Sequence, residues 1–155
     1  MIRKLVCGLV LAALLPFSGT AAALLPPIGP WQGVYRCAQG ETALDLQITA
    51  RSPTRIKAVF YFHALPANPR VPRGCFTMRG SFNQASGRIT LTPAAWLHRP
   101  PFFVSVAVDG KVSRGVLSGR IEGPACSGFR LERSLAPPMP AAPKSCRMGQ
   151  QGPVA

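Results

Sequence analysis

The stretch WQGVYRCAQGETALDLQI, from Trp31 to Ile48, holds two alternating runs of residues around a glycine-centred turn. Small or apolar side chains occupy every second position from Trp31 to Cys37, and Leu44, Leu46 and Ile48 repeat this spacing after the turn. In an extended chain, alternate side chains point to opposite faces, so each run has one face for a core and one for water. We therefore predict a β-hairpin, and because a lone hairpin is marginal in water, further strands must complete the sheet.

The rest of the sequence supplies these strands between turn signals. We expect strands at residues 31–38, 42–50, 55–64, 76–82, 88–92, 102–108, 115–123 and 127–133. Eight short strands predict an all-β antiparallel meander, and closing it into a small barrel would remove the exposed edges; a two-sheet β-sandwich is the alternative. Closure would also bring the basic end of the last strand, Arg130 to Arg133, near Trp31, where a cation could lie over the indole.

Proline and glycine set the expected interruptions of the sheet. Three prolines in residues 65–74 predict the longest loop, and the proline-bounded stretch 93–101 is expected to break the sheet after the fifth strand. Asp109-Gly110 is a strong turn dipeptide that should end the sixth strand. The expected inward side chains are large: Trp31, Tyr35, Phe60, Phe62, Phe76, Met78, Phe82, Phe102 and Phe129. Such a set is typical of a barrel filled by its own side chains rather than of one that encloses a ligand cavity.

The N-terminus has the pattern of a secretory signal peptide. Arg3 and Lys4 precede an apolar run, and small residues end at Ala23, so we predict a signal peptide over residues 1–23 with cleavage near Ala23. The apolar run is shorter than the roughly 20 helical residues that span a bilayer, and no later stretch is long enough. We expect a Pro-rich lead at 24–30, a β-barrel domain at 31–134, a disordered tail at 135–155, and a periplasmic or secreted location without a transmembrane segment.

Four cysteines remain after cleavage: Cys37, Cys75, Cys126 and Cys146. An even number in an exported chain favours disulfides over metal ligation, and the spacing is not that of a metal site. Three pairings are open. We expect Cys37 to pair with Cys126, because closing a barrel brings the first and last strands together, and this leaves Cys75 and Cys146 to pair or to stay free.

The chain is strongly basic. Its 18 basic and 5 acidic residues give a net charge of +13, which falls to +11 when Arg3 and Lys4 leave with the signal peptide. Such a charge attracts anionic partners, here an anionic envelope polymer or a protein, whereas export argues against nucleic acid. A GC-rich coding sequence, which favours Arg, Ala, Pro and Gly, would explain the same charge without any partner.

The inventory of reactive residues does not predict catalysis. Hydrolysis needs a nucleophile with a base and an orienting group, or two facing carboxylates. The five acidic residues flank a hairpin, lie in a turn, or occupy outward or strand-end positions, so no pair is expected to face a cavity. Neither His63 nor His98 has a partner spaced for a triad or a metal site. We therefore expect no enzyme activity and no cofactor or metal.

A diffuse set of aromatic and basic residues is the best binding candidate. Tyr61, His63, Trp96, His98 and Arg99 lie on a strand end and in a proline-bounded segment, where recognition residues often occur. The alternative is that Trp96 fills one end of the barrel as part of the core.

The early pattern W-x-G-x-Y-x-C-x-Q-G, here Trp31 to Gly40, resembles that of a family of small exported bacterial β-domains of unassigned function. The segments 71–76, 96–100 and 126–131 are similar to the same family. This resemblance implies an extracytoplasmic β-domain and no activity. A looser likeness to lipocalin- and avidin-like barrels is architectural only, because those begin with Gly-x-Trp and this chain has Trp-x-Gly.

Three functions follow, in this order. The first is a secreted, non-enzymatic binding domain that engages an anionic or protein surface in the cell envelope or outside the cell. The second is a carrier of a small apolar ligand inside the barrel, which an interior cavity of several hundred Å³ would move to first place. The third is an envelope enzyme or an enzyme inhibitor.

Overall fold

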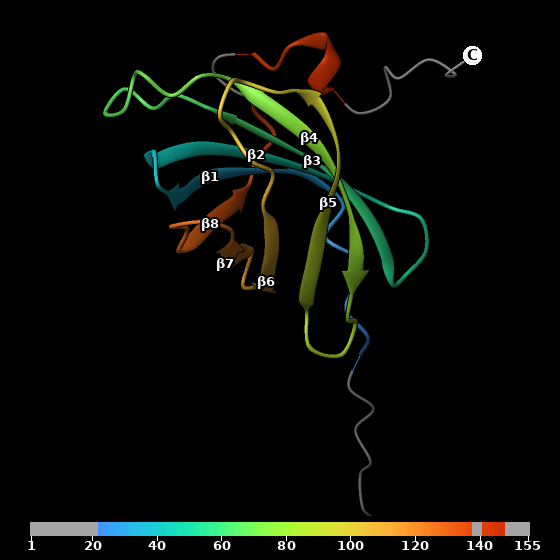
Figure 1. Cartoon of the computed structure of the whole chain (residues 1–155). Helices are drawn as coiled ribbons and strands as arrows, with labels where there is room; N and C mark the ends of the chain where they lie inside the picture. Colours follow the sequence, from blue (N-terminus) through green and yellow to red (C-terminus); the bar gives the residue numbers. More distant parts are fainter. Residues whose placement is uncertain (1–21, 138–140, 148–155) are drawn as a thin grey trace, which may run out of the picture.

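A computed structural model describes residues 22–137 and 141–147. The chain forms a closed antiparallel barrel in which each strand pairs with the next and β1 pairs with β8 (Figure 1). The strands are β1 (Gly29–Cys37), β2 (Gly40–Ala50), β3 (Arg55–His63), β4 (Gly74–Phe82), β5 (Arg88–His98), β6 (Ala107–Ser113), β7 (Val116–Glu122) and β8 (Gly128–Arg133). The predicted eight-stranded meander barrel is confirmed. The expected signal peptide lies outside the described residues apart from Ala22 and Ala23.

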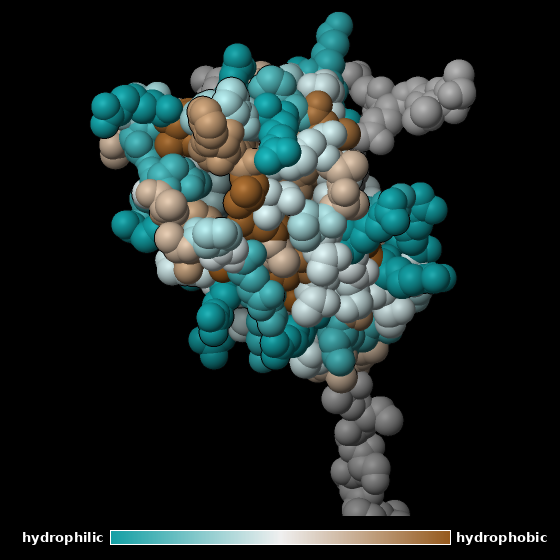
Figure 2. All heavy atoms as spheres, in the orientation of Figure 1, coloured by the Kyte–Doolittle hydropathy of each residue, from teal (hydrophilic) through white to brown (hydrophobic). Residues whose placement is uncertain are grey.

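The inner face of the barrel is an apolar core, as the alternation predicts. Leu44, Leu46 and Ile48 of β2 point inward and are at most 1 % exposed, and alternate residues of β3 pack against them. The outer surface is largely hydrophilic in the view of Figure 2, with apolar patches between. Eight strands enclose an interior just wide enough to be filled by side chains or to hold one small ligand.

A glycine makes the closure between β1 and β8 tight. A Cβ atom on Gly33 would lie 2.0 Å from the carbonyl oxygen of Arg130, so only glycine fits where the first strand approaches the last. The pairing runs from Trp31 opposite Arg133 to Tyr35 opposite Phe129. The first and last strands therefore meet along a ladder, which is the contact that turns the meander into a barrel.

Two predicted interruptions were wrong. The sheet does not break at residues 93–101: β5 continues to His98 through a bulge after Pro93, where the Thr77 hydroxyl accepts a hydrogen bond from the Ala95 amide over 3.1 Å. Asp109-Gly110 lies within β6, because the missing side chain of Gly110 leaves room for the Phe129 ring, which a Cβ would approach to 2.7 Å.

The turn expected at Asp109-Gly110 occurs five residues later. Arg114 and Gly115, with φ of 50° and 77°, form the two-residue connection between β6 and β7. Positive φ at both positions suits the twist of a tight hairpin. The shift also moves Phe102 out of the predicted sixth strand: its side chain is fully exposed rather than inward.

Two disulfides are present. Cys37, at the end of β1, pairs with Cys126 in the β7–β8 loop, as predicted from barrel closure. Cys75, on the outer face of β4, pairs with Cys146 in a 3-10 turn at Lys144–Cys146. Two disulfides fit a protein that resides outside the reducing cytoplasm. The part of the chain that the model describes has no helix long and apolar enough to cross a membrane.

The C-terminal segment differs from the disordered tail that the composition predicts. Residues 141–147 lie against the outer face of the barrel, near the upper ends of β4 and β5 in Figure 1. Cys146 is buried together with Val59, Tyr61 and Cys75. The sequence of this segment has little apolar surface with which to pack on the barrel. The Cys75–Cys146 disulfide attaches it to the sheet instead.

Candidate ligand-binding site at the open end of the barrel

One end of the barrel is sealed by Trp31. Its side chain is 1 % exposed, and the indole Nε1 donates to the Pro27 carbonyl oxygen over 2.9 Å. The Arg133 guanidinium lies 4.9 Å from the centre of the indole ring and donates to the Ile28 carbonyl oxygen over 2.6 Å. The predicted cation over the indole is thus confirmed, and the Pro-rich lead crosses the barrel end as a lid over it.

The other end is open. It is formed by the β1–β2 turn, the β3–β4 loop, the β5–β6 connection and the β7–β8 loop. The β3–β4 loop lies at the left of Figure 1, and the β5–β6 connection crosses its upper middle. A cavity of about 330 Å³ opens there, and its walls are mostly apolar, with several aromatic rings among them. It is lined by Tyr35, Phe60, Phe62, Phe76 and Phe103, with Phe102 at the rim and the Cys37–Cys126 disulfide along one side. The side chains expected to fill the core completely therefore leave room at this end.

The aromatic rings form one continuous cluster. Phe60 stacks on Phe76 with centroids 4.8 Å apart, and Tyr35 meets the edge of Phe60 at 5.2 Å. Phe103, from the β5–β6 connection, stacks on Phe62 at 5.1 Å. Because the rings support one another, the walls of the cavity are held in place without a ligand.

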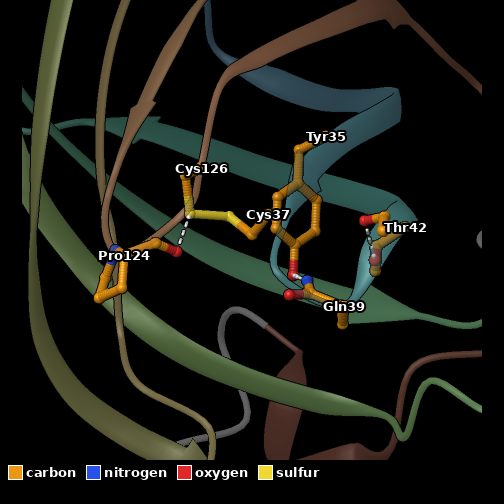
Figure 3. Close-up of a disulfide and its surroundings, with 7 residues drawn as sticks. Tyr35, Cys37, Gln39, Thr42, Pro124 and Cys126 are labelled. Carbon is orange, nitrogen blue, oxygen red and sulfur yellow. Dashed lines mark hydrogen bonds between the residues drawn. A yellow bond between two sulfur atoms is a disulfide. The ribbon is translucent and has the colours of Figure 1, made fainter.

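The polar groups in this cavity are few and lie together. Figure 3 shows the Tyr35 hydroxyl meeting the side chain of Gln39, whose amide donates to it over 2.9 Å, next to the Cys37–Cys126 disulfide. Burial raises the pKa of Tyr35, against a smaller lowering effect of hydrogen bonds with Gln39 and Thr42. The tyrosine thus presents a neutral hydroxyl to an apolar cavity, which can orient one polar group of a ligand.

The loops around the opening are tied to one another. The Asn68 side chain donates to the carbonyl oxygens of Gln39 and Glu41, at 2.8 and 3.0 Å, and so joins the β3–β4 loop to the β1–β2 turn. Arg99 Nε donates to the Phe103 carbonyl oxygen over 3.0 Å. The opening is therefore a formed structure rather than a gap between independent loops.

The predicted binding residues do not form one site. Trp96 and Arg99 lie together at the open end, with the guanidinium 5.7 Å from the indole centroid. The Trp96 ring meets Phe76 at 5.0 Å and is partly buried against the core, as the alternative interpretation predicts. His98 is exposed and pairs in register with Cys75, whose side chain lies on the outer face.

Tyr61 and His63 lie on the outer face of β3. Both are buried, at 2 % and 5 % exposure. Tyr61 is covered by the C-terminal segment, and burial raises its pKa, which Arg73 lowers and Asp45 raises to smaller extents. The outer face of β3 is thus covered in part by the chain itself.

The structure reveals a pair that the sequence analysis missed. His63 Nε2 lies 2.9 Å from Asp45 Oδ2, and its Nδ1 donates to the Ala64 carbonyl oxygen over 3.0 Å. Asp45 and His63 are diagonal neighbours on adjacent strands, since Ala43 is opposite His63. The hairpin register would have indicated this contact, whereas spacing along the sequence does not. The imidazole is fixed on both sides, which suits a structural role on the sheet.

A second hollow of about 480 Å³ lies between the outer face of β1 to β3 and the C-terminal segment. Trp31, Tyr61 and Cys146 contribute to its lining. One of its walls is the segment that begins at Ala141, whereas the walls of the interior cavity belong to the barrel and its cross-linked loops. The interior cavity is therefore the better candidate site.

Comparisons of the chain with family models, with curated proteins and with solved structures found no match. The resemblance to exported bacterial β-domains thus stays a prediction. Within residues 22–137 and 141–147, no group of three or more His, Cys, Asp or Glu side chains is placed to hold a metal ion.

Proposed function

We propose that this protein binds a small apolar ligand, preferably an aromatic one, in the open end of its barrel. The observation that carries the proposal is the cavity of about 330 Å³, lined by aromatic rings. Ligand cavities in proteins range from roughly 300 to 1,000 Å³ and combine apolar walls with a few polar groups. The sequence alone favours a surface-binding domain over a ligand carrier. Because of this cavity, we rank the ligand carrier first.

The walls define the chemistry of the ligand. Flat rings at the positions of Phe62, Phe76 and Phe103 favour a ring or a short acyl chain, which can stack or pack between them. Tyr35 and Gln39 offer hydroxyl and amide groups for one polar substituent. The role is non-enzymatic binding, and the predicted signal peptide together with the disulfides supports action in the periplasm or outside the cell.

Binding can be tested with N-phenyl-1-naphthylamine, a neutral aromatic dye whose fluorescence rises in apolar surroundings. Because the dye carries no charge, the basic surface does not attract it. We expect saturable binding of one dye per protein. Phe103→Ala should weaken it about tenfold, since a stacked ring and its apolar area leave the wall.

A pair of matched variants locates the dye. Val104→Trp places a bulky ring at the rim of the cavity, and Leu135→Trp places the same ring on an exposed position beyond β8, next to the sealed end. We expect Val104→Trp to reduce dye binding and Leu135→Trp to leave it unchanged. Equal binding by both variants and the wild-type protein would remove the open end as the site.

An anionic partner stays as a second candidate function. The net charge of +13 supports it, as do the exposed arginines at the open end, Arg70, Arg73 and Arg99. Net charge alone supports association with an anionic partner but identifies neither the partner nor the binding surface.

A further inference from the structure

The rim of the open end carries an aromatic side chain turned into solvent. Phe102 is fully exposed, and the neighbouring Val104 is 54 % exposed. The backbone of Phe102 has φ of 66°, a left-handed conformation that is unfavourable for a bulky residue. Strain of this kind persists where the surrounding structure enforces it and is concentrated at functional sites. Here it directs a large apolar side chain away from the core.

The loops around this rim carry positive charge and no negative charge. They are the four segments 38–39, 64–73, 99–106 and 123–127. Their charged residues are Arg70, Arg73 and Arg99, all exposed. The nearest acidic residues along the chain are at strand ends: Glu41 is hydrogen-bonded to Arg36, and Glu122 ends β7. The open end therefore combines exposed apolar groups with exposed cations.

We infer that the rim of the open end docks on the surface of an anionic lipid bilayer. Phe102 and Val104 enter the boundary between headgroups and acyl chains, and the three arginines lie at the level of the lipid phosphates. Aromatic and aliphatic side chains inserted to this depth, with cations beside them, are the usual means by which a protein binds such an interface. In this orientation the cavity faces the lipid. The inference goes beyond the proposed ligand and does not require it.

The apolar part of the rim distinguishes a bilayer from an acidic polymer. A charged polymer would be bound by the arginines alone and would leave Phe102 in water. A bilayer offers an apolar phase for the ring and anionic groups for the arginines at once. In Figure 2, brown and tan surface adjoins teal surface over the region where the β5–β6 connection crosses in Figure 1, as this mode of binding requires.

The test is sedimentation of the purified chain with lipid vesicles at about 0.1 M salt, where exposed charges act over roughly 10 Å. One vesicle is phosphatidylcholine alone, and the other is phosphatidylcholine with phosphatidylglycerol. We expect the protein to sediment with the vesicles that contain phosphatidylglycerol and to stay in solution with the neutral ones. Binding should fall as salt is raised, because part of it is electrostatic.

Two pairs of variants separate the rim from the rest of the surface. Phe102→Asn introduces a residue that tolerates the left-handed backbone. We expect vesicle binding to fall about tenfold or more, because the inserted ring is lost. Leu135→Asn, on an exposed position next to the sealed end, should leave binding unchanged. Arg70→Glu should reduce binding at least about fivefold, whereas Arg51→Glu, in the β2–β3 turn at the other end, should have a smaller effect.

Equal binding to neutral and anionic vesicles would overturn the inference. So would equal losses for Arg70→Glu and Arg51→Glu with no loss for Phe102→Asn, because binding would then come from diffuse charge, as expected for an acidic polymer. Each variant is checked by circular dichroism for an unchanged fold. Dye binding is measured without vesicles and vesicle binding without dye, so either proposal can fail alone.

Discussion

The two ends of the barrel differ in how far their aromatic side chains are shielded from water. At the sealed end, Trp31 is covered by the Pro-rich lead and by Arg133, and its indole N–H is hydrogen-bonded. At the open end, aromatic rings line a cavity, and Phe102 is fully exposed at its rim. The difference suggests a division of labour: the sealed end supplies stability, and the open end supplies access at the expense of apolar surface left in contact with water.

The sharpest test of this division is to truncate one aromatic side chain at each end. Trp31→Ala should lower the free energy of unfolding by about 3 to 5 kcal/mol, because it removes a fully buried ring and leaves a cavity. Phe103→Ala, at the half-buried wall of the open end, should lower it by only about 1 kcal/mol. Denaturant unfolding measures both values. Similar losses would contradict the division.

The two disulfides extend the comparison to the cross-links. Changing both Cys37 and Cys126 to serine should destabilise the protein by about 4 kcal/mol, because a loop of 89 residues is released in the unfolded chain. Loop closure alone predicts nearly the same loss for the same change at Cys75 and Cys146, which are 71 residues apart, so any smaller effect there must have another cause. Without its cross-link, segment 141–147 also gains freedom in the folded protein, which offsets part of the loss. We therefore expect the unfolding midpoint to fall less when Cys75 and Cys146 are changed than when Cys37 and Cys126 are changed. The reverse order would show that the C-terminal segment is part of the core.

Alkaline pH probes the two tyrosines. Burial raises the pKa of both Tyr35 and Tyr61 above the ordinary value of 10.0. Above pH 10 the unfolded chain therefore releases protons that the folded protein retains, so stability falls by about 1.4 kcal/mol per pH unit for each tyrosine until the folded pKa is reached. Stability is unaffected by these groups below pH 10. Absorbance at the tyrosinate band should rise at a higher pH in the folded protein than in the unfolded chain.

A variant at the open end gives the alkaline test its control. Tyr35→Phe removes one of the two groups, so the decrease of stability with pH should become shallower. An early rise of tyrosinate absorbance near pH 10 in the folded wild-type protein would show that the tyrosine hydroxyls are open to water.

The smallest expected effect is a gain. Phe102→Gly should raise the free energy of unfolding by about 0.5 kcal/mol, since relief of roughly 1 to 2 kcal/mol of left-handed strain outweighs the greater freedom of glycine in the unfolded chain. Leu135→Gly, at an exposed position next to the sealed end, should give no gain. A loss at Phe102 would mean that its side chain packs on the rim and stabilises the fold.

The sequence allows prediction of the fold because the barrel is built from alternation. Runs such as that from Trp31 to Cys37 specify a strand and its inward face together, and closing the resulting sheet correctly predicts the Cys37–Cys126 disulfide and the cation over Trp31. Turn positions are less certain. Asp109-Gly110 has the composition of a turn, but tertiary packing of Phe129 against Gly110 decides its conformation.

The candidate site could be predicted only in part. The rings that line it appear in the sequence as core, and whether they fill the barrel depends on distances that no spacing reveals. Phe102 has the composition of a strand residue, yet the proline-bounded connection turns it outward. Tyr61 is covered by a segment that the Cys75–Cys146 bond holds on the barrel. Long-range contacts, which local patterns do not encode, account for the cavity and for the cover over Tyr61, whereas the local backbone of the connection accounts for Phe102.

The ladder between β1 and β8 also dictates an order of events when the chain folds. Consecutive strands are joined by connections of two to ten residues, whereas Trp31 and Arg133 are separated by the whole barrel sequence. Forming contacts so distant in sequence is slow, because the entropy of joining the ends must be overcome before the ladder rewards it. We therefore expect Cys37 and Cys126 to be oxidised late in folding, so that the bond locks a nearly finished barrel.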